Sequence, residues 1–403
     1  MNMQKLILGT AVSVLVGVSL AGMPAARADD PVSMHGFMDT TLFSQSQTFL
    51  FGNGQNAELP TSSNSQSFSG IDARNTRVWW DITGPQFNDG WSSKAHLEAD
   101  FFGGFNGTGP YSTSQETPRL RQAMFTLTSP SGSSSVTIGQ QWDLMFPIYS
   151  VPESLAHIAF PLGFGTGMIG WRYPGVVWSQ DLTSQQASSQ WRLDLGAFTG
   201  DWNGPGASGS NTNYESAGNV GLRPQIEGRL YFKSGDLTAY GALHFSHQDL
   251  TGVSGTAPTP IASSISSWGA TVGAAWHPGP FSLVGAIYDG KGIGQLFGSM
   301  AQFGDISTKG AYVQGGYKFT PNWAGYLSYA TDRPNNDDVI AWMGAGSDGR
   351  LKGQQEAFDI IYSSGPFGVG FEYMHASNEV TTTGIDRTTF TGNQASVSAI
   401  FHF

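Results

Sequence analysis

The chain of 403 residues contains no cysteine and has little charge. Without cysteine there is neither a disulfide framework nor a thiolate metal site. Charged residues make up 12% of the chain, against about 25% in ordinary soluble domains. After residue 28 no apolar run approaches the roughly 18 residues of a membrane-spanning helix, which excludes a helical membrane protein. Low charge without such helices is compatible with a β-barrel whose outer face contacts lipid.

The N-terminus has the pattern of a secretory signal peptide. Lys5 precedes an apolar stretch at 6–22, and Ala-Arg-Ala at 26–28 fits a small-residue cleavage site. A membrane anchor is the alternative, but the stretch is marginally short and is followed by Pro24. We therefore expect residues 1–28 to be a signal peptide and residues 29–403 to form a single domain.

The mature chain is acidic and carries no recognisable enzyme motif. Without residues 1–28 it has 17 basic and 30 acidic residues, a net charge of about −13, which excludes nucleic acid as a partner. Among the eight histidines, only His96 lies in a constellation that resembles a catalytic or metal site, with Glu98 and Asp100. Polar residues of that kind are expected on any strand face that meets water. We expect no catalytic residue, no metal and no cofactor.

Alternation of apolar and polar residues is the strongest pattern in the sequence. In SSKAHLEADFF, from Ser92, Ala95 and Leu97 fall on one face, while Lys94, His96, Glu98 and Asp100 fall on the other. Such segments predict an all-β protein with sixteen strands, at about 33–45, 72–83, 91–103, 118–128, 134–143, 170–182, 189–201, 222–234, 236–249, 264–277, 280–290, 308–320, 322–333, 353–363, 366–378 and 388–403. Most of these strands are long enough to cross a bilayer when tilted.

The connections between the predicted strands are alternately long and short. The short ones have turn chemistry, such as KSGD, HPGP and FTPN, and the long ones include 46–71, 202–221, 250–263 and 334–352. Seven aromatic residues fall near the short-turn ends: Trp91, Trp191, Trp276, Phe281, Phe319, Trp323 and Phe367. Short turns at one end, long loops at the other and an even number of strands predict a transmembrane antiparallel β-barrel. The aromatic residues would then form a girdle at the membrane interface.

Strand parity also predicts the residues of the barrel lumen. Thirteen charged residues are candidates for the pore lining or its constriction: Arg74, Arg77, Lys94, His96, Glu98, Asp100, Arg119, Arg121, Glu153, His157, Arg192, Arg223 and Arg229. Arg119 and Arg121 share the parity of outward residues, so either a β-bulge resets the register or their strand faces the other way. Arginines on several strands predict a basic wall that favours anions, although each of them could instead be paired with a carboxylate. Asp337 and Asp338 are either solvated loop charges or ligands of a divalent cation near lipopolysaccharide.

Several motifs resemble Gram-negative outer-membrane porins. The closing strand ends on Phe403 in NQASVSAIFHF, and LEADFFGGF, PRLRQAMFTL and TIGQQWDLMFP are similar to the DcaP-like and general-porin branch of the sixteen-stranded type. The resemblance implies a trimeric channel for passive diffusion of small hydrophilic solutes, with anions such as carboxylates favoured by the basic wall. It also implies contact with outer-membrane lipid and lipopolysaccharide, and recognition of Phe403 by the barrel-assembly machinery.

The loop between 143 and 170 is unusually apolar, and the resemblance implies that it folds into the pore. It contains Gly165-x-Gly167-x-x-Gly170, the spacing of a dinucleotide-binding fingerprint. No helix pattern follows this motif, because Pro174 stands close behind it. We instead expect the glycines to let the backbone lie against the barrel wall, although packing outside the pore remains an alternative.

Three other functions stay open from the sequence. A barrel enzyme would depend on His96, a structural or adhesive barrel would be plugged by its loops, and a secreted soluble β-protein would not enter a membrane. The solute, the bore, the gating and the oligomeric state are not determined by the sequence.

Overall fold

The computed structural model describes residues 32–50, 52–61, 67–87, 90–105, 114–200, 223–250 and 262–403. The predicted signal peptide, the loop at 202–221 and most of the loop at 250–263 lie outside these residues. Among the residues that are described, no helix is long and apolar enough to cross a membrane.

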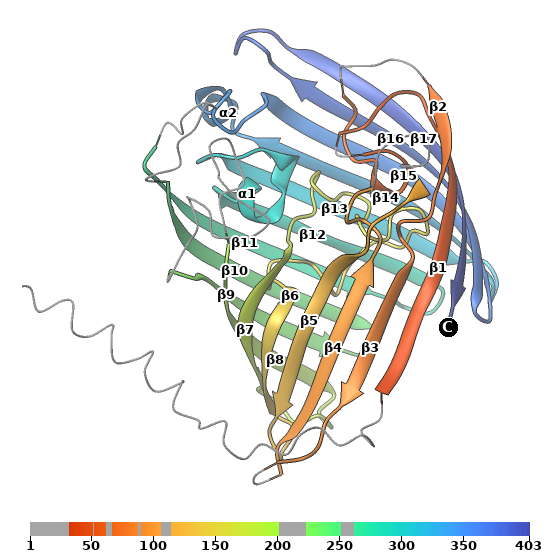
Figure 1. Cartoon of the computed structure of the whole chain (residues 1–403), viewed down its shortest axis with the longest axis vertical. Coiled ribbons are helices and arrows are strands. Elements are labelled where there is room, and N and C mark those ends of the chain that lie inside the picture. Colours follow the sequence, from red (N-terminus) through yellow and green to blue (C-terminus); the bar gives the residue numbers. More distant parts are fainter. Residues whose placement is uncertain are drawn as a thin grey trace, which may run out of the picture.

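Strands dominate the described chain, and Figure 1 shows them as one continuous wall. Their bounds are β1 (Val32–Gln45), β2 (Phe68–Asp72), β3 (Arg77–Thr83), β4 (Ser92–Asp100), β5 (Arg119–Thr128), β6 (Ser134–Trp142), β7 (Arg172–Asp181), β8 (Ser189–Phe198), β9 (Gln225–Ser234), β10 (Leu237–Asp249), β11 (Ser264–Trp276), β12 (Phe281–Lys291), β13 (Ser307–Lys318), β14 (Trp323–Pro334), β15 (Arg350–Ser364), β16 (Phe367–Val380) and β17 (Thr388–His402). Short helical segments are η2 (Gly54–Asn56), α1 (Gly294–Phe297), η4 (Ser299–Ala301) and α2 (Asn336–Ala341).

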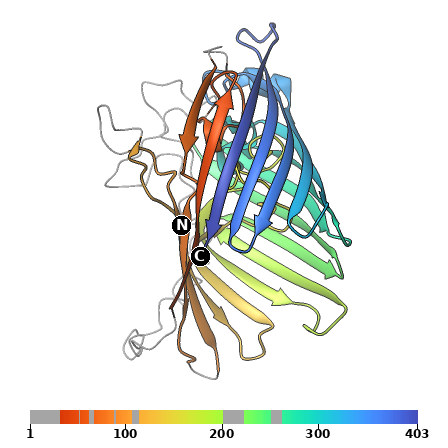
Figure 2. The same cartoon turned by 90° about the vertical axis from the view of Figure 1, so that its right-hand side faces the viewer.

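The sheet closes on itself as a sixteen-stranded antiparallel barrel, as the alternation predicts. Each strand pairs with its neighbours in sequence, and β1 pairs with β17 through nine residue pairs, Phe37–Gln45 against Gln394–His402. On its other edge β1 pairs with both β2 and β3, so these two form one interrupted strand of the barrel. The predicted second strand at 72–83 is wrong in this detail, because the chain leaves the ladder at 73–76. The first and the last described strands are thus paired, as a wall in lipid requires, and Figure 2 shows them side by side.

Side chains alternate between the two faces of the wall. The outer face carries exposed apolar residues, such as Val272, Ile287 and Leu327, at 60, 62 and 67% exposure. Their sequence neighbours Thr271 and Tyr288 are buried on the inner face. Apolar side chains outside and polar side chains inside are the reverse of the arrangement in a soluble protein. This arrangement is typical of a barrel surrounded by hydrocarbon.

The connections are short at one end of the barrel and long at the other. Short turns include 235–236, 277–280, 319–322 and 365–366. Of the seven aromatic residues predicted near the short turns, six are exposed and Trp91 is partly exposed. Several pack against each other across strands with tilted rings, as Phe281 does with Tyr317 and Trp323 with Tyr362. The outer face at the short-turn end thus carries a band of aromatic rings.

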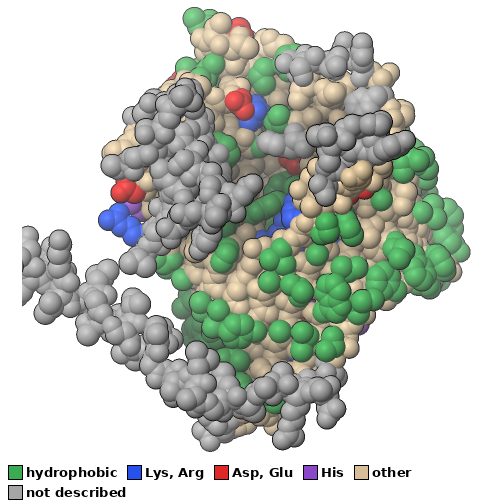
Figure 3. Space-filling model, in the orientation of Figure 1, with side chains coloured by type: hydrophobic (Ala, Val, Ile, Leu, Met, Phe, Trp, Pro, Cys, Tyr) green, Lys and Arg blue, Asp and Glu red, His purple; other side chains and the backbone are tan. Residues whose placement is uncertain are grey.

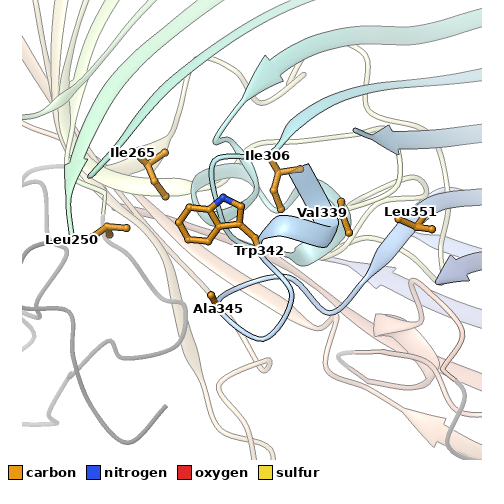
Figure 4. Close-up of a cluster of buried hydrophobic side chains, with 7 residues drawn as sticks. All are labelled: Leu250, Ile265, Ile306, Val339, Trp342, Ala345 and Leu351. Carbon is orange, nitrogen blue, oxygen red and sulfur yellow. The ribbon is translucent and has the colours of Figure 1, made fainter. Parts of the chain in front are cut away.

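The long connections pack together over the other end. The α2 segment places Trp342 against Ile265 and Ile306 in a buried apolar cluster, drawn in Figure 4. Asn335 caps α2 by accepting a hydrogen bond from the Asp338 amide, and the Asp338 carboxylate accepts one from the Ser307 amide. Asp338 therefore has a structural role that orders the connection between β14 and β15.

Candidate functional site

A β-bulge in β5 decides the direction of two of the predicted lumen arginines. In the ladder with β4, Glu98 faces Gln122 and Ala99 faces Leu120, so Arg121 is the extra residue. Leu120 and Phe125 are then both exposed outside although their parity differs. The bulge therefore resets the register and turns Arg119 and Arg121 to the inside, which is the first of the two alternatives that the sequence leaves open.

Arg119 and Arg121 share two carboxylates on β4. Arg119 Nη2 lies 2.7 Å from Asp100 Oδ2, and Arg121 Nη1 lies 2.8 Å from the same oxygen. Arg121 also pairs with Glu98. Asp100 is fully buried and Arg121 nearly so, hence these ion pairs lie away from bulk water. Removing one partner of such a pair typically costs about 3–5 kcal/mol, because the other charge is left uncompensated.

Two further arginines join this cluster without a carboxylate of their own. Arg77 on β3 and Arg172 on β7 both lie within electrostatic reach of Arg121, Glu98 and Asp100. Neither forms an ion pair within the described ranges, and each has a buried guanidinium nitrogen without a hydrogen-bond partner. Four guanidinium groups thus share two carboxylates, which leaves a surplus of two positive charges on this wall.

Arg172 was not among the residues predicted from the sequence. Its guanidinium carbon lies 4.5 Å from the ring centroid of Trp171 and 4.7 Å from that of Trp142. The side chain is 5% exposed, so the two indoles hold a nearly buried cation in place. A tryptophan next to arginine in WRYPG is the only sequence signal, and it does not show that Trp142 reaches the same guanidinium from β6.

A second group of predicted residues lies towards the short turns. Arg192 on β8 and Arg229 on β9 both pair with Asp194, with closest distances of 2.9 and 3.0 Å. All three line a cavity of about 400 Å³ together with Trp142, Asp143 and Gln141. Here two cations share Asp194, and Asp143 and Asp181 add carboxyl groups to the same cavity, so its lining has no surplus of basic residues.

The segment 143–171 runs along the inner face of the barrel. Gln314 on β13 bonds both the amide and the carbonyl of Glu153, at 2.7 and 2.8 Å. Gln355 on β15 accepts a hydrogen bond from the Gly163 amide. On the opposite side of the segment, the Asn75 side chain bonds the Ala156 carbonyl at 2.8 Å and the Ala159 amide at 3.0 Å. We call 143–171 the inserted loop, because its partners are inward-facing side chains on both sides of the barrel.

The glycines of the dinucleotide-like motif are needed for backbone geometry. Gly165, Gly167 and Gly170 have φ values of 70°, 118° and 122°, which residues with a side chain rarely adopt. A Cβ at Gly167 would lie 2.2 Å from the Ala311 carbonyl oxygen on β13. The motif therefore brings the backbone against the wall, and no helix follows it as nucleotide binding requires.

Above the inserted loop lies a second cavity, of about 550 Å³. Phe160, Phe164, Trp171 and Arg172 line it from the inserted loop and β7. Glu58 lines it from the connection between β1 and β2, Phe297 from α1 and Arg350 from the start of β15. Arg350 donates to the carbonyls of Met300 and Ala301, two residues held at positive φ. Figure 3 shows the molecule hollowed on one face, with cationic and hydrophobic side chains visible in the hollow.

Other predicted residues do not join the arginine cluster. Arg74 pairs with Asp72 at 2.8 Å beside the break between β2 and β3. Lys94 is exposed on β4, and Arg223 is exposed and precedes β9, so its assignment to a wall strand is wrong. Glu153 is exposed on the inserted loop, whereas His157 is buried against Glu372.

The constellation of His96, Glu98 and Asp100 is not a site in the structure. His96 Nδ1 lies 2.7 Å from Asp81 Oδ1, while Glu98 and Asp100 are paired with arginines. The residues on which an enzyme hypothesis depended are thus bound to separate partners.

Comparison with known proteins places the fold among outer-membrane channels. The outer-membrane channel DcaP of Acinetobacter baumannii is 18% identical, with a TM-score of 0.70 over 95% of this chain and 100% of its own. OmpT, an outer-membrane protein of Vibrio cholerae, is 14% identical, with a TM-score of 0.56 over 95% of this chain and 100% of its own. Pseudomonas putida OprB is 11% identical, with a TM-score of 0.51 over 92% of this chain and 94% of its own. No family model and no curated protein matches the sequence. At these identities the likeness defines the class of fold, a sixteen-stranded barrel of the DcaP type.

Proposed function

We propose that this chain is an outer-membrane porin that passes small hydrophilic solutes by passive diffusion and favours anions such as carboxylates. The observation that carries the anion preference is the charge surplus at Arg77, Arg119, Arg121 and Arg172, where four cations share two carboxylates. Selectivity in a pore is set by the charge and hydrogen-bonding groups at its narrow parts, where the low dielectric strengthens electrostatic interactions. The negative net charge of the whole chain therefore does not decide which ions pass.

The proposed setting is the outer membrane of a Gram-negative bacterium, reached through a cleaved signal peptide at 1–28. Support comes from the exposed apolar outer face and from the barrel's likeness to outer-membrane channels. Phe403 follows the last strand, with its backbone bonded to Gly36 on β1, so the barrel-assembly machinery would act where the barrel closes. A homotrimer, and contact with lipopolysaccharide, belong to the same proposal.

Single-channel recording in a planar bilayer tests this proposal. We expect stable conductance in wild-type protein and a reversal potential that shows anion preference under a salt gradient. The double variant Arg77→Gln/Arg172→Gln should reduce the preference for anions, because it removes the charge surplus. Lys291→Gln/Lys352→Gln is the matched control, since it also removes two charges, from the outer faces of β12 and β15.

Each other result has a clear meaning for the proposal. Conductance with cation preference in the wild type would contradict the proposed basic wall but would still support the proposal that the chain is a porin. A silent bilayer, with insertion of the barrel confirmed, would contradict the channel and favour a barrel that its loops plug.

A further inference from the structure

Four cations occupy consecutive strands on the outer face, near the long connections. They are Lys291 on β12, Lys309 on β13, Arg333 on β14 and Lys352 on β15. Lys291 and Lys309 share the parity of exposed apolar residues on their strands, such as Ile287 and Val313. In Figure 1 the strands β12–β15 lead to the connections that contain α1 and α2. A basic belt thus borders the apolar surface at the long-loop end.

The strand register brings two of these cations face to face. Lys309 is the direct cross-strand partner of Arg333, and on its other side it is the partner of Asp289. Lys309 Nζ lies 3.1 Å from Asp289 Oδ2 and Lys291 Nζ lies 2.9 Å from Asp305 Oδ2, so two of the four cations have a carboxylate partner. Within the described chain Arg333 and Lys352 form no ion pair. Like charges directly opposite each other destabilise a sheet. The row therefore matches an anion from outside the chain.

A groove lies on the membrane side of this charged row. The next outward residues across β11–β14 are Val272, Ile287, Ala311 and Thr331, which are mutual partners in the register. Together with Ala270 and the charged residues Asp289, Lys309 and Arg333 they line an outer cavity of about 600 Å³. Small side chains at Ala270 and Ala311 leave room between the exposed Val272 and Ile287. An apolar groove that ends at two cations fits a molecule with an acyl chain and an anionic head.

We propose that the outer face of β11–β14 binds a phosphorylated acyl lipid of the surrounding leaflet. Its phosphate lies between Lys309 and Arg333, and one acyl chain lies in the groove over Ile287 and Ala311. Phosphate oxygens accept charge-assisted hydrogen bonds from both cations and so relieve their repulsion. The inference rests on the proposed outer-membrane location, where lipopolysaccharide is the lipid of this chemistry on the long-loop side.

Titration of the purified full barrel in detergent with lipopolysaccharide tests the site, with bound lipid counted by native mass spectrometry. Lys309→Gln/Arg333→Gln should bind about tenfold more weakly, since each cation near a membrane surface contributes modestly to phosphate attraction. Lys233→Gln/Lys318→Gln is the control, because it removes the same charge at the short-turn end. Ala311→Phe fills the groove without changing charge and should also weaken binding.

Three results would overturn the site. One is equal binding of lipopolysaccharide by the double variant and its control. Another is displacement of the lipid by inorganic phosphate at equal concentration, because the acyl chain would then contribute nothing. The third is a cross-link between two copies through position 309, which would make the face a subunit contact. Conductance of the same preparations is measured separately. A barrel that binds lipid but does not conduct would contradict the proposed porin function and would still support the lipid site.

Discussion

His157 on the inserted loop lies 2.6 Å from Glu372 on β16, measured from Nδ1 to Oε1, and both side chains are buried. The Ser154 hydroxyl donates to the other oxygen of the same carboxylate at 2.5 Å. The second histidine nitrogen, Nε2, lies 3.2 Å from the Ala57 carbonyl oxygen. One carboxylate on the wall therefore holds the middle of the inserted loop, and His157 links it to the connection between β1 and β2.

The contact with Glu372 predicts that the inserted loop loosens at alkaline pH. Burial lowers the pKa of His157, but the charge and hydrogen bond of Glu372, the Ala57 carbonyl and the Asp72 charge together raise the pKa above its ordinary value of 6.5. The stabilisation is then complete below pH 6.5 and is lost as the pH rises through the folded pKa. Hydrogen-exchange protection of residues 150–165, corrected for intrinsic rates, should fall over that range. His157→Gln should remove the pH dependence, and constant protection in the wild type would contradict the prediction.

Glu58 predicts a second pH effect, in the cavity above the inserted loop. Burial raises the pKa of Glu58 to about 8, and the nearby Arg350 charge opposes this only in part. A raised carboxyl pKa means that its contribution to stability is greatest below pH 4.5 and is lost as the pH rises through 8. Above that pH the new negative charge should lower anion preference. Reversal potentials between pH 6 and pH 10, roughly two units on either side of this pKa, check it. Glu58→Gln should show no such step.

Asp194→Asn should make the pore more selective for anions and the barrel less stable. Asp194 is buried and pairs with Arg192 and Arg229, so its neutralisation leaves two cations unpaired. We expect stability to fall by about 3–5 kcal/mol, as for other broken buried pairs. Reversal potential and urea unfolding measure the two effects. Asp236→Asn is the control, because Asp236 lies in the exposed turn 235–236 and has no ion pair among the described residues. An unchanged reversal potential in Asp194→Asn would refute the prediction.

Gly167→Ala should displace the inserted loop. Its φ of 118° and the 2.2 Å approach of a Cβ to the Ala311 carbonyl leave no place for a methyl group. Backbone strain of this kind costs of the order of 1–3 kcal/mol. We expect a lower melting temperature and altered conductance. Gly315→Ala is the matched control on β13, where a Cβ meets nothing within 4 Å. Equal melting temperatures of the two variants would show that the close approach is not needed.

Much of the fold could be predicted because its causes are local. Alternation in segments such as SSKAHLEADFF places apolar residues on lipid and polar ones inside, and turn chemistry separates the strands. The break at 73–76 could not be predicted, because Asn75 leaves the ladder to bond Ala156, which is far away in the sequence. Strand parity left two explanations open for Arg119 and Arg121, and the bulge opposite Glu98 and Ala99 decides between them.

The sequence by itself determined a closed antiparallel barrel, its strand number and the alternation of short and long connections. These features follow from period-two patterning and from turns, which act over a few residues. Only the tertiary structure decided which lumen charges are neutralised, because Asp100 meets Arg119 and Asp194 meets Arg229 across strands. It also decided that Arg172 lies between Trp142 and Trp171 with no ion-pair partner among the described residues, and that Lys309 faces Arg333, since register between strands sets both.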